Sequence, residues 1–275
     1  MSTEAPIPRW GSEAIDPNGF NIPSLKARYL LDHLPRTGSV LEVGSGSGKF
    51  LRTLAAHRPG LDVHGCDIAD WTPPVGIGFR LMTNDLPYDA TTFDAVLIVD
   101  VLEHVPDPEH VVREILRVLK PGGRFVGFVP IEGEPHSLYT FYRKLLGEDL
   151  YVRTKHHVNA FTYADVARLL AGRFDVVDTS HIYHPLGHAM DATFFAATRL
   201  PQLAHFWWRD NKYYAGTQTR ESPFVFALNR VLELGNVVAY LESRLFAKHR
   251  MGIAGLLFEA LVAKTGDLRR AASIM

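Results

Sequence analysis

The sequence is poor in cysteine, in net charge and in long apolar runs, and each of these shortages argues against one class of protein. One cysteine, Cys66, stands among 275 residues, which excludes an intramolecular disulfide and a multi-cysteine metal site. Lys and Arg number 29 against 30 Asp and Glu, and a net charge of −1 does not suit a protein that grips nucleic-acid phosphates. No run reaches about 18 apolar residues, so no membrane span is predicted.

The beginning of the chain lacks the basic head and apolar run of a secretory signal. We therefore expect a soluble, cytoplasmic protein. Hydrophobic residues make up 47% of the chain and charged residues 21%, which is the composition of a globular protein. Residues 200–275 differ from the rest, because they carry a net charge of +4 and a third of the aromatic residues.

Short apolar runs alternate with amphipathic helical patterns along most of the chain, which predicts a mostly parallel sheet with helices on both faces. Phe93 to Val99 is almost wholly apolar and is expected to be a central strand. The other expected strands cover 39–43, 61–66, 78–82, 124–129 and 174–180, and the expected helices cover 23–34, 49–57, 107–119, 162–171 and about 224–247.

The same pattern divides the chain into four parts. We expect an N-terminal helical leader over 1–37 and an α/β core over 38–181. Residues 182–251 are aromatic and basic, and we interpret them as a helical cap inserted before the last strand. Residues 252–263 fit a strand or a helix, and the strand interpretation makes 252–275 the last strand of the sheet and a tail.

A glycine loop follows the first expected strand, with Glu42 ahead of Gly44, Gly46 and Gly48. Such a strand-to-helix turn lets a ligand approach the backbone closely. A nucleoside-triphosphate loop would need Gly at 43 and Ser or Thr at 50, where Val and Phe stand. A dinucleotide fingerprint would need a small residue at 49, which is Lys.

The remaining pattern, acidic-x-Gly-x-Gly-x-Gly, resembles motif I of the class I methyltransferases that use S-adenosylmethionine, type 11-like members included. Further signatures of this family follow in order over residues 38–130. They are Asp67 at the end of the second strand, Asn84 to Tyr88 before the fourth strand, Val101-Leu102-Glu103-His104-Val105, and Leu119-Lys120-Pro121-Gly122-Gly123. The resemblance implies a Rossmann-like fold with a seven-stranded sheet.

The resemblance also implies a cofactor site. Asp67 would hold the ribose, and Ile68 would stack on the adenine. Met82 stands where the family often has an Asp that binds the adenine amine, and Asp85 is the candidate to replace it. The residues expected at the methionine end are Glu42, which supplies negative charge, Gly44, Ser45, Gly46, Gly48, Asp100 and Val101.

Methyl transfer to a hydroxyl needs a group that takes its proton, and histidine suits that role near neutral pH. Glu103 and His104 follow the fourth strand at the sheet edge where open α/β proteins bind ligands. His136, on a loop after the fifth strand, and His157, before the sixth-strand unit, are further candidates for the acceptor site.

The spacing of His184, His188 and Asp191 offers metal ligands, with His181 nearby. Pro185 and Gly187 interrupt any helix there, so no regular spacing aligns these groups. S-adenosylmethionine is therefore the expected cofactor, and a divalent metal is the alternative.

Together these features predict O-methylation of a bulky small molecule, such as a glycan, lipid-linked sugar, quinone or secondary metabolite, by in-line transfer with a His or Glu base. Two alternatives stay open. Aromatic and basic residues over 200–251, such as Trp207, Trp208 and Arg209, would suit peripheral membrane contact and a membrane-embedded or lipid-linked acceptor. A non-catalytic scaffold that binds the cofactor is the other. No nucleic-acid partner is expected, and the sequence does not fix an oligomeric state.

Overall fold

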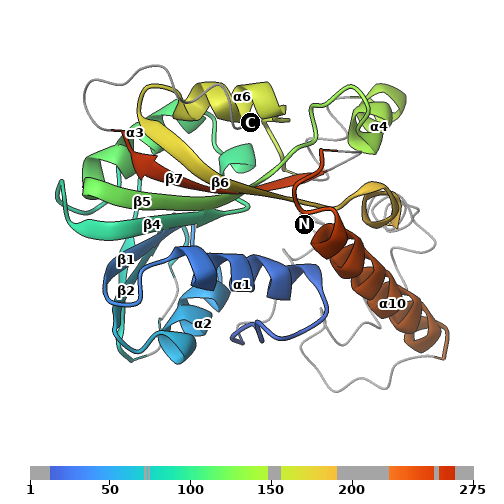
Figure 1. Cartoon of the computed structure of the whole chain (residues 1–275), viewed down its shortest axis with the longest axis horizontal. Coiled ribbons are helices and arrows are strands. Elements are labelled where there is room, and N and C mark those ends of the chain that lie inside the picture. Colours follow the sequence, from blue (N-terminus) through green and yellow to red (C-terminus); the bar gives the residue numbers. More distant parts are fainter. Residues whose placement is uncertain are drawn as a thin grey trace, which may run out of the picture.

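A computed structural model describes residues 13–70, 73, 75–147, 156–190, 223–250 and 254–263. Its centre is a seven-stranded sheet of order β3-β2-β1-β4-β5-β7-β6 (Figure 1). The strands are β1 Gly38–Val43, β2 Leu61–Asp67, β3 Ile77–Leu81, β4 Phe93–Val99, β5 Leu119–Pro130, β6 Phe174–Ile182 and β7 Gly255–Val262. The expected Rossmann-like, mostly parallel sheet is confirmed, because β1 to β6 run in one direction and β7 alone among the described strands runs in the opposite one, antiparallel to β5 and β6.

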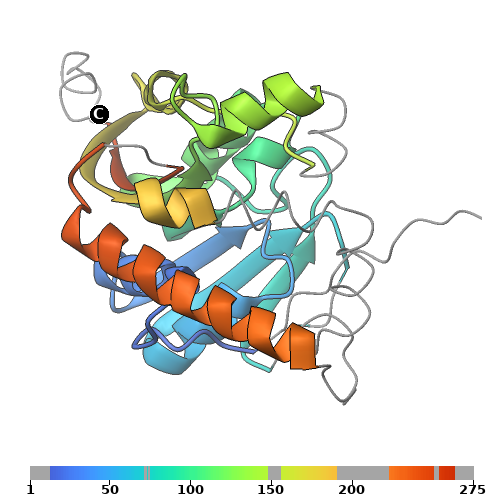
Figure 2. The ribbon, with the colours of Figure 1, turned by 90° about the vertical axis from the view of Figure 1, so that its right-hand side faces the viewer.

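Helices cover both faces of this sheet. The α-helices are α1 Ile22–His33, α2 Lys49–His57, α3 Pro108–Val118, α4 Leu138–Leu146, α6 Tyr163–Leu170 and α10 Pro223–Leu245, and a short 3-10 helix, η1, spans Leu102–His104. Helices α1, α2 and α10 lie on one face and α3 and α6 on the other (Figure 1). Figure 2 shows α10 as the long helix that crosses in front of α1 and α2.

Local sequence signals explain where several helices begin. Asp107 caps α3 by accepting a hydrogen bond from the backbone N–H of His110 at 2.9 Å. Thr162 and Asp165 form a capping box at the start of α6, in which each side chain accepts from the other residue's backbone N–H. Apolar side chains spaced along each helix then bury one stripe against the sheet.

The register of the parallel strands sets the position of the ligand-binding edge. Val43 pairs with Cys66 of β2 and with Ile98 of β4, so β1, β2 and β4 end side by side. The loops that follow these three strands therefore meet at one edge of the sheet, where α/β proteins bind ligands. This edge positions the glycine loop, the end of β2 and the η1 helix together.

Three local expectations need correction. The expected strand over 124–129 begins at Leu119, because the Pro-Gly-Gly at 121–123 forms an irregularity inside the strand where a helix end was expected. The expected third strand runs over Ile77–Leu81 instead of 78–82. Helix α4 was not anticipated from the sequence.

The last element of the core is a strand, as interpreted from the sequence, since β7 pairs with both β5 and β6. Helix α10 precedes β7 in the chain and contacts β6 and α1. The aromatic residues Phe206, Trp207 and Trp208 of the expected cap lie outside the described residues. Among the helices that the structure describes, none has the length and apolarity that a bilayer crossing requires.

Candidate active site at the carboxyl edge of the sheet

The glycine loop between β1 and α2 has the backbone that its glycines predict. Gly44, Gly46 and Gly48 all have positive φ angles, of 70°, 52° and 74°. A Cβ on Gly44 would collide with the side chain of Val101, so this position requires glycine for packing as well. A Cβ on Gly46 would meet no atom within 4 Å, so the loop leaves open space there for a ligand to approach the backbone.

Glu42 lies beneath this loop and is only 2% exposed. Its carboxyl accepts a hydrogen bond from the backbone N–H of Leu51 in the first turn of α2, and burial raises its pKa well above the usual value. Its second oxygen, Oε2, has no hydrogen-bond partner among the described residues. A buried acceptor without a donor marks a place where a ligand group or water fits.

Asp67 at the end of β2 points its carboxylate into the same loop. Oδ2 accepts from the backbone N–H of Gly46 at 2.7 Å, and Oδ1 accepts from that of Ala69 at 2.9 Å. A carboxylate has about four acceptor sites, so two hydroxyl donors can still bind to it. Ile68, the next residue, is 76% exposed, which fits a side chain that a flat ring covers.

Asp100 follows β4 with a positive φ of 55°. Its Oδ2 accepts from Nζ of Lys26 at 2.7 Å, and the same ammonium lies 3.5 Å from the centre of the Phe128 ring. Lys26 comes from α1 and is buried, so the N-terminal helix contributes a cation to the site. The sequence held a signal for it: Lys26 lies four residues from both Ile22 and Leu30, which places it on the buried face.

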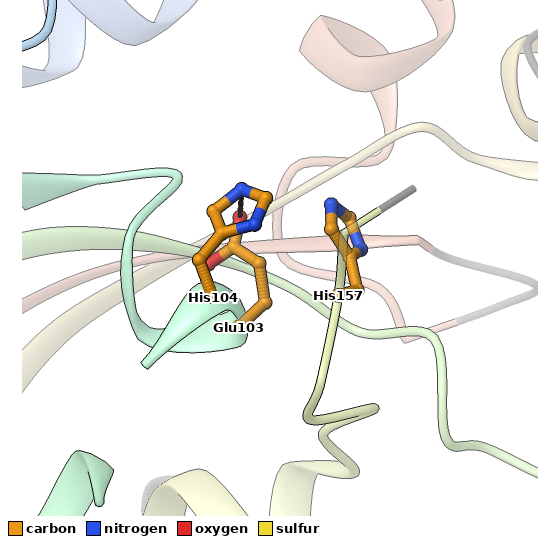
Figure 3. A group of neighbouring side chains, drawn as sticks. All are labelled: Glu103, His104 and His157. Carbon is orange, nitrogen blue, oxygen red and sulfur yellow. Dashed lines mark ion pairs between the residues drawn. The ribbon is translucent and has the colours of Figure 1, made fainter. Parts of the chain in front are cut away.

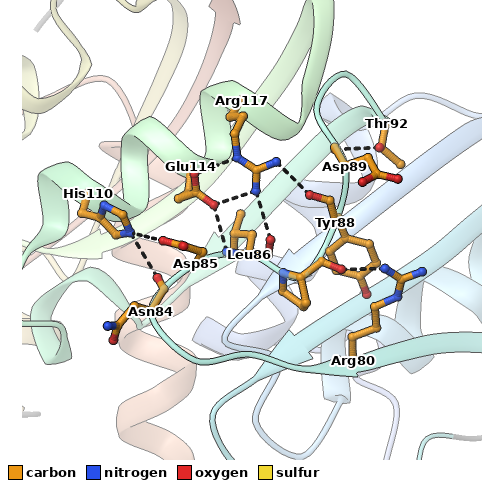
Figure 4. A network of polar contacts seen from close by, with 11 residues as sticks. Arg80, Asn84, Asp85, Leu86, Tyr88, Asp89, Thr92, His110, Glu114 and Arg117 are labelled. Atoms are coloured by element: carbon orange, nitrogen blue, oxygen red, sulfur yellow. Dashed lines mark hydrogen bonds and ion pairs between the residues drawn. The ribbon is translucent and has the colours of Figure 1, made fainter.

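The segment before β4 is held against α3 by a polar network (Figure 4). Arg117 donates to the Glu114 carboxylate at 2.7 Å and to the backbone carbonyl oxygens of Leu86 and Tyr88. The Arg117 guanidinium lowers the pKa of Glu114. Asp85, the candidate adenine ligand, is exposed and pairs with Nε2 of His110 at 2.9 Å, so its carboxylate is turned toward α3.

Three of the four predicted catalytic candidates lie together at η1 (Figure 3). One ligand-type atom from each of Glu103, His104 and His157 lies within 4.8 Å of the others. The two imidazole rings meet edge to face at 4.8 Å between centroids. Backbone bonds fix the contact, since the N–H groups of Val158 and Asn159 both donate to the carbonyl oxygen of Glu103.

The partners of the two imidazoles define which ring nitrogen carries the proton. Nδ1 of His104 lies 2.9 Å from the carbonyl oxygen of His156, and Nδ1 of His157 lies 2.7 Å from Oε2 of Glu132. Both partners are acceptors, so each Nδ1 is the donor, and in the neutral form of each ring Nε2 keeps its lone pair. Burial lowers the pKa of His104 below 6.5, which favours its neutral form at pH 7.

Glu103 is 1% exposed, and neither of its carboxylate oxygens has a hydrogen-bond partner among the described residues. The nearest approach of His104 to it, Nε2 to Oε1, is 3.9 Å, which is too long for a hydrogen bond. Burial, then the charge of nearby Asp100, raises the pKa of Glu103 well above its usual value. The carboxyl is therefore poised to receive a donor from outside the chain.

The glycine loop and this cluster are neighbours in space. Val101, whose side chain would meet a Cβ on Gly44, immediately precedes η1, and Glu103 and His104 follow within three residues. A ligand on the loop and a second molecule against the cluster would therefore approach each other at the sheet edge.

Other predicted residues lie elsewhere. His136 is exposed on the turn before α4 and lies outside the cluster. His184 and His188 are buried, and Nε2 of His188 accepts from the backbone N–H of Leu138, so they pack the fold. The expectation that Pro185 and Gly187 interrupt any helix is wrong, because residues 185–190 are helical and the N–H of His188 donates to the carbonyl oxygen of His184. Asp191, the third member of that predicted metal set, lies outside the described residues.

Sequence reasoning gave no individual role to two residues that organise the cluster. Glu132, buried after β5, orients His157, and Asn159 donates from Nδ2 to the carbonyl oxygens of Leu102 and Val105 at 3.2 and 2.7 Å. Both act across more than 20 residues of chain, and no periodic pattern signals such contacts.

Comparisons with known proteins identify the family of this chain. A family model described as a methyltransferase domain matches residues 21–173, more than half of the chain. A demethylmenaquinone methyltransferase of Tropheryma whipplei is 38% identical over 96 residues, covering 32% of this chain and 39% of that protein. This chain thus spans about two fifths of that relative's length.

A ubiquinone biosynthesis O-methyltransferase of Coxiella burnetii is 26% identical over 182 residues, covering 61% of this chain and 77% of that protein. Geranyl diphosphate C-methyltransferase of Streptomyces coelicolor shares the fold, with a TM-score of 0.52 at 16% identity over 88% of this chain and 81% of that chain. The glycine loop, Asp67 and the matching family model lead to one conclusion: this chain belongs to the class I methyltransferases that use S-adenosylmethionine.

Proposed function

We propose that the protein transfers a methyl group from S-adenosylmethionine to a hydroxyl oxygen of a bulky, quinol-type small molecule. The observation that carries the proposal is the cluster of Glu103, His104 and His157, which gathers lone pairs beside the glycine loop. The relatives include a demethylmenaquinone methyltransferase and a ubiquinone biosynthesis O-methyltransferase, which favours a quinol ring over the sugar acceptors that the sequence also allowed.

The site residues fit the cofactor on the evidence of the loop itself. Open space over Gly46 allows backbone contact, the orphaned Oε2 of Glu42 suits a positively charged group, and Asp67 can accept from ribose hydroxyls. When bound, the cofactor supplies an electrophilic methyl group on a sulfonium, a good leaving group. The remaining work of the chain is to align the acceptor oxygen and remove its proton.

His104 is the residue best placed to take that proton. Its side chain is 39% exposed, so an acceptor can reach it, and its Nε2 lone pair faces the cluster. A lone pair of the hydroxyl oxygen forms the new O–CH₃ bond, the S–CH₃ bond breaks, and the hydroxyl proton passes to Nε2. Oε1 of Glu103 lies 3.9 Å from that nitrogen. The imidazolium that forms lowers the pKa of this carboxyl, so the ionised carboxylate and the cation stabilise each other.

Carbon methylation of the same ring is the second candidate, because one relative is a demethylmenaquinone methyltransferase. A non-catalytic scaffold would bind the cofactor without turnover. The net charge of −1 supports a small-molecule acceptor over nucleic acid. Docking on a membrane through residues 200–251 stays an alternative, which Leu234 and Leu245 of α10, 65% and 75% exposed, would suit.

The experiment is incubation of the protein with methyl-labelled S-adenosylmethionine and two quinols, one with a free ring hydroxyl beside a methoxy group and one with an unsubstituted ring carbon. Mass spectrometry then distinguishes a new methoxy from a new C-methyl group. A methoxy product supports the proposal. A C-methyl product replaces it with the second candidate, and cofactor binding without either product favours the scaffold.

A further inference from the structure

We propose that Glu103, His104 and His157 bind one divalent transition-metal cation. The inference deepens the proposed function, because the cation would lie where the acceptor hydroxyl is expected. It starts from the distances among the three ligand-type atoms, all within 4.8 Å of one another (Figure 3). No other group of three such side chains lies this close in the part of the chain that the structure describes.

The hydrogen bonds of the two histidines leave only acceptor atoms on the side where the histidines and Glu103 meet. Nδ1 of each histidine donates outward, to the carbonyl oxygen of His156 or to Glu132. Each Nε2 therefore carries a lone pair, as a metal-binding imidazole requires. The third side chain, Glu103, also offers lone pairs alone when ionised. A cation satisfies three such groups at once.

The buried carboxylate is the independent observation that points to a ligand. Glu103 is 1% exposed, and both of its oxygens lack a hydrogen-bond partner among the described residues. A carboxyl group left in that state costs free energy unless something binds it. A cation held by Glu103 and two imidazoles removes that cost.

The outer contacts have the arrangement that metal-binding histidines use. Glu132 is 4% exposed and holds Nδ1 of His157 at 2.7 Å, which is the carboxylate–histidine–metal relay. The carbonyl of His156, a residue with a positive φ of 58°, holds the ring of His104 in the same way. Hydrogen bonds to Nδ1 thus orient both rings in the metal-free protein.

Ligand chemistry narrows the class of cation. Two imidazoles and one carboxylate suit Zn²⁺, Mn²⁺, Fe²⁺ or Co²⁺ better than Mg²⁺ or Ca²⁺, which prefer oxygen ligands. Three protein ligands leave coordination positions open, and the partly exposed His104 gives a path from solvent. An acceptor hydroxyl bound there would lose its proton more readily, and that proton would pass to solvent water, because Nε2 of His104 would then be a ligand and no longer the base.

The test uses Co²⁺, which reports its coordination by visible absorption, with untagged full-length protein that has been treated with chelator and dialysed. We expect one Co²⁺ per chain. Glu132→Gln removes a residue that orients a ligand, and it should weaken Co²⁺ binding by roughly 10- to 100-fold. Glu103→Gln and His157→Asn each remove a ligand, and each should weaken Co²⁺ binding more than Glu132→Gln does.

Asp62→Asn is the matched control, because Asp62 pairs with His64 at 2.9 Å at the start of β2, outside the cluster. Its Co²⁺ affinity should equal that of the unaltered protein. His104→Asn changes a partly exposed ligand, so it tests the metal site even if Glu103→Gln or His157→Asn fails to fold. Cofactor affinity, measured by calorimetry, confirms that each variant is folded.

Failure of the metal site and failure of the proposed function give different results. Absence of stoichiometric Co²⁺ binding, or equal binding by Glu103→Gln, His157→Asn and Asp62→Asn, overturns the metal site whether or not quinols are methylated. Co²⁺ binding that these substitutions abolish supports the site even if no quinol is a substrate. If Glu103 and the histidines share a proton in place of a metal, the protein will not bind Co²⁺ stoichiometrically.

Discussion

The glycine loop and the η1 cluster each contain one buried carboxyl group, and the two differ in how the chain satisfies it. Glu42 accepts from the backbone N–H of Leu51 and has one oxygen without a partner, while Glu103 has two. The loop is built from neighbours in sequence, whereas Glu103 meets His157 from a segment more than 50 residues away. The polar groups of the loop are thus mostly satisfied by the chain itself, whereas the Glu103 carboxyl lacks a hydrogen-bond partner that a ligand could provide.

This difference predicts separable effects, with the loop governing cofactor affinity and the cluster governing transfer. Glu103→Gln tests the separation most sharply. General acid–base groups contribute about 10²–10⁴-fold, so we expect transfer at saturating cofactor to fall by about that factor. The melting temperature should not fall, because the substitution replaces a buried carboxyl that has no partner among the described residues with an amide that never ionises. Undiminished turnover would show that the cluster does no chemistry.

Asp67→Ala is the corresponding change on the loop side. It removes acceptors for the ribose hydroxyls and for the backbone N–H of Gly46, so cofactor binding should weaken by about 1–3 kcal/mol. Turnover at saturating cofactor should change little. Titration calorimetry and a saturation curve measure the two quantities, and an unchanged affinity would remove Asp67 from the ribose site.

Gly46→Ala and Gly122→Ala form a matched pair. Both glycines have positive φ, and a Cβ on either meets no atom within 4 Å. Each substitution should therefore cost about 1–2 kcal/mol of stability from backbone strain. Only Gly46→Ala should also weaken cofactor binding, by about 1–2 kcal/mol, because its methyl group occupies the open space over the loop. Equal cofactor affinities would place the ligand elsewhere.

Glu42→Gln tests the pH dependence of the loop. The folded-state pKa of Glu42 lies above its unfolded value, so this group destabilises the fold progressively as the pH rises above about 4.5. Glutamine keeps an acceptor for Leu51 and does not titrate. The variant should be more stable than the unaltered protein by about 1 kcal/mol at pH 8, and the difference should shrink toward pH 4. Thermal melts from pH 4 to pH 8 measure this difference in stability. A difference that does not change with pH would contradict the raised pKa of Glu42.

Lys26→Met should have the smallest effect. It removes the 2.7 Å ion pair with Asp100, whose side chain is 47% exposed, and keeps an apolar side chain over the Phe128 ring. Solvent can compensate Asp100, so we expect a loss of about 0.5–1 kcal/mol of stability, measured by urea titration. A loss of several kcal/mol would mean that Asp100 depends on α1 far more than its exposure suggests.

Much of the fold was predictable because its signals are local. The apolar run over Phe93–Val99 and the amphipathic pattern of 49–57 coincide with β4 and α2. The irregular start of β5 was not predictable, since Pro-Gly-Gly ends a helix as readily as it distorts a strand. Helix α4 has a local signal that the sequence analysis did not use, because Ser137 caps it by accepting from the backbone N–H of Tyr139.

The sequence by itself determined the strand–helix alternation, the glycine loop and the acidic residue after β2, because each depends on residues within a few positions of one another. Only the tertiary structure decided that Lys26 reaches Asp100, that Glu132 orients His157, and that His136 lies apart from the cluster. Those contacts depend on the register and order of the strands, which bring distant loops to one edge of the sheet. Residue spacing along the chain carries no record of that arrangement.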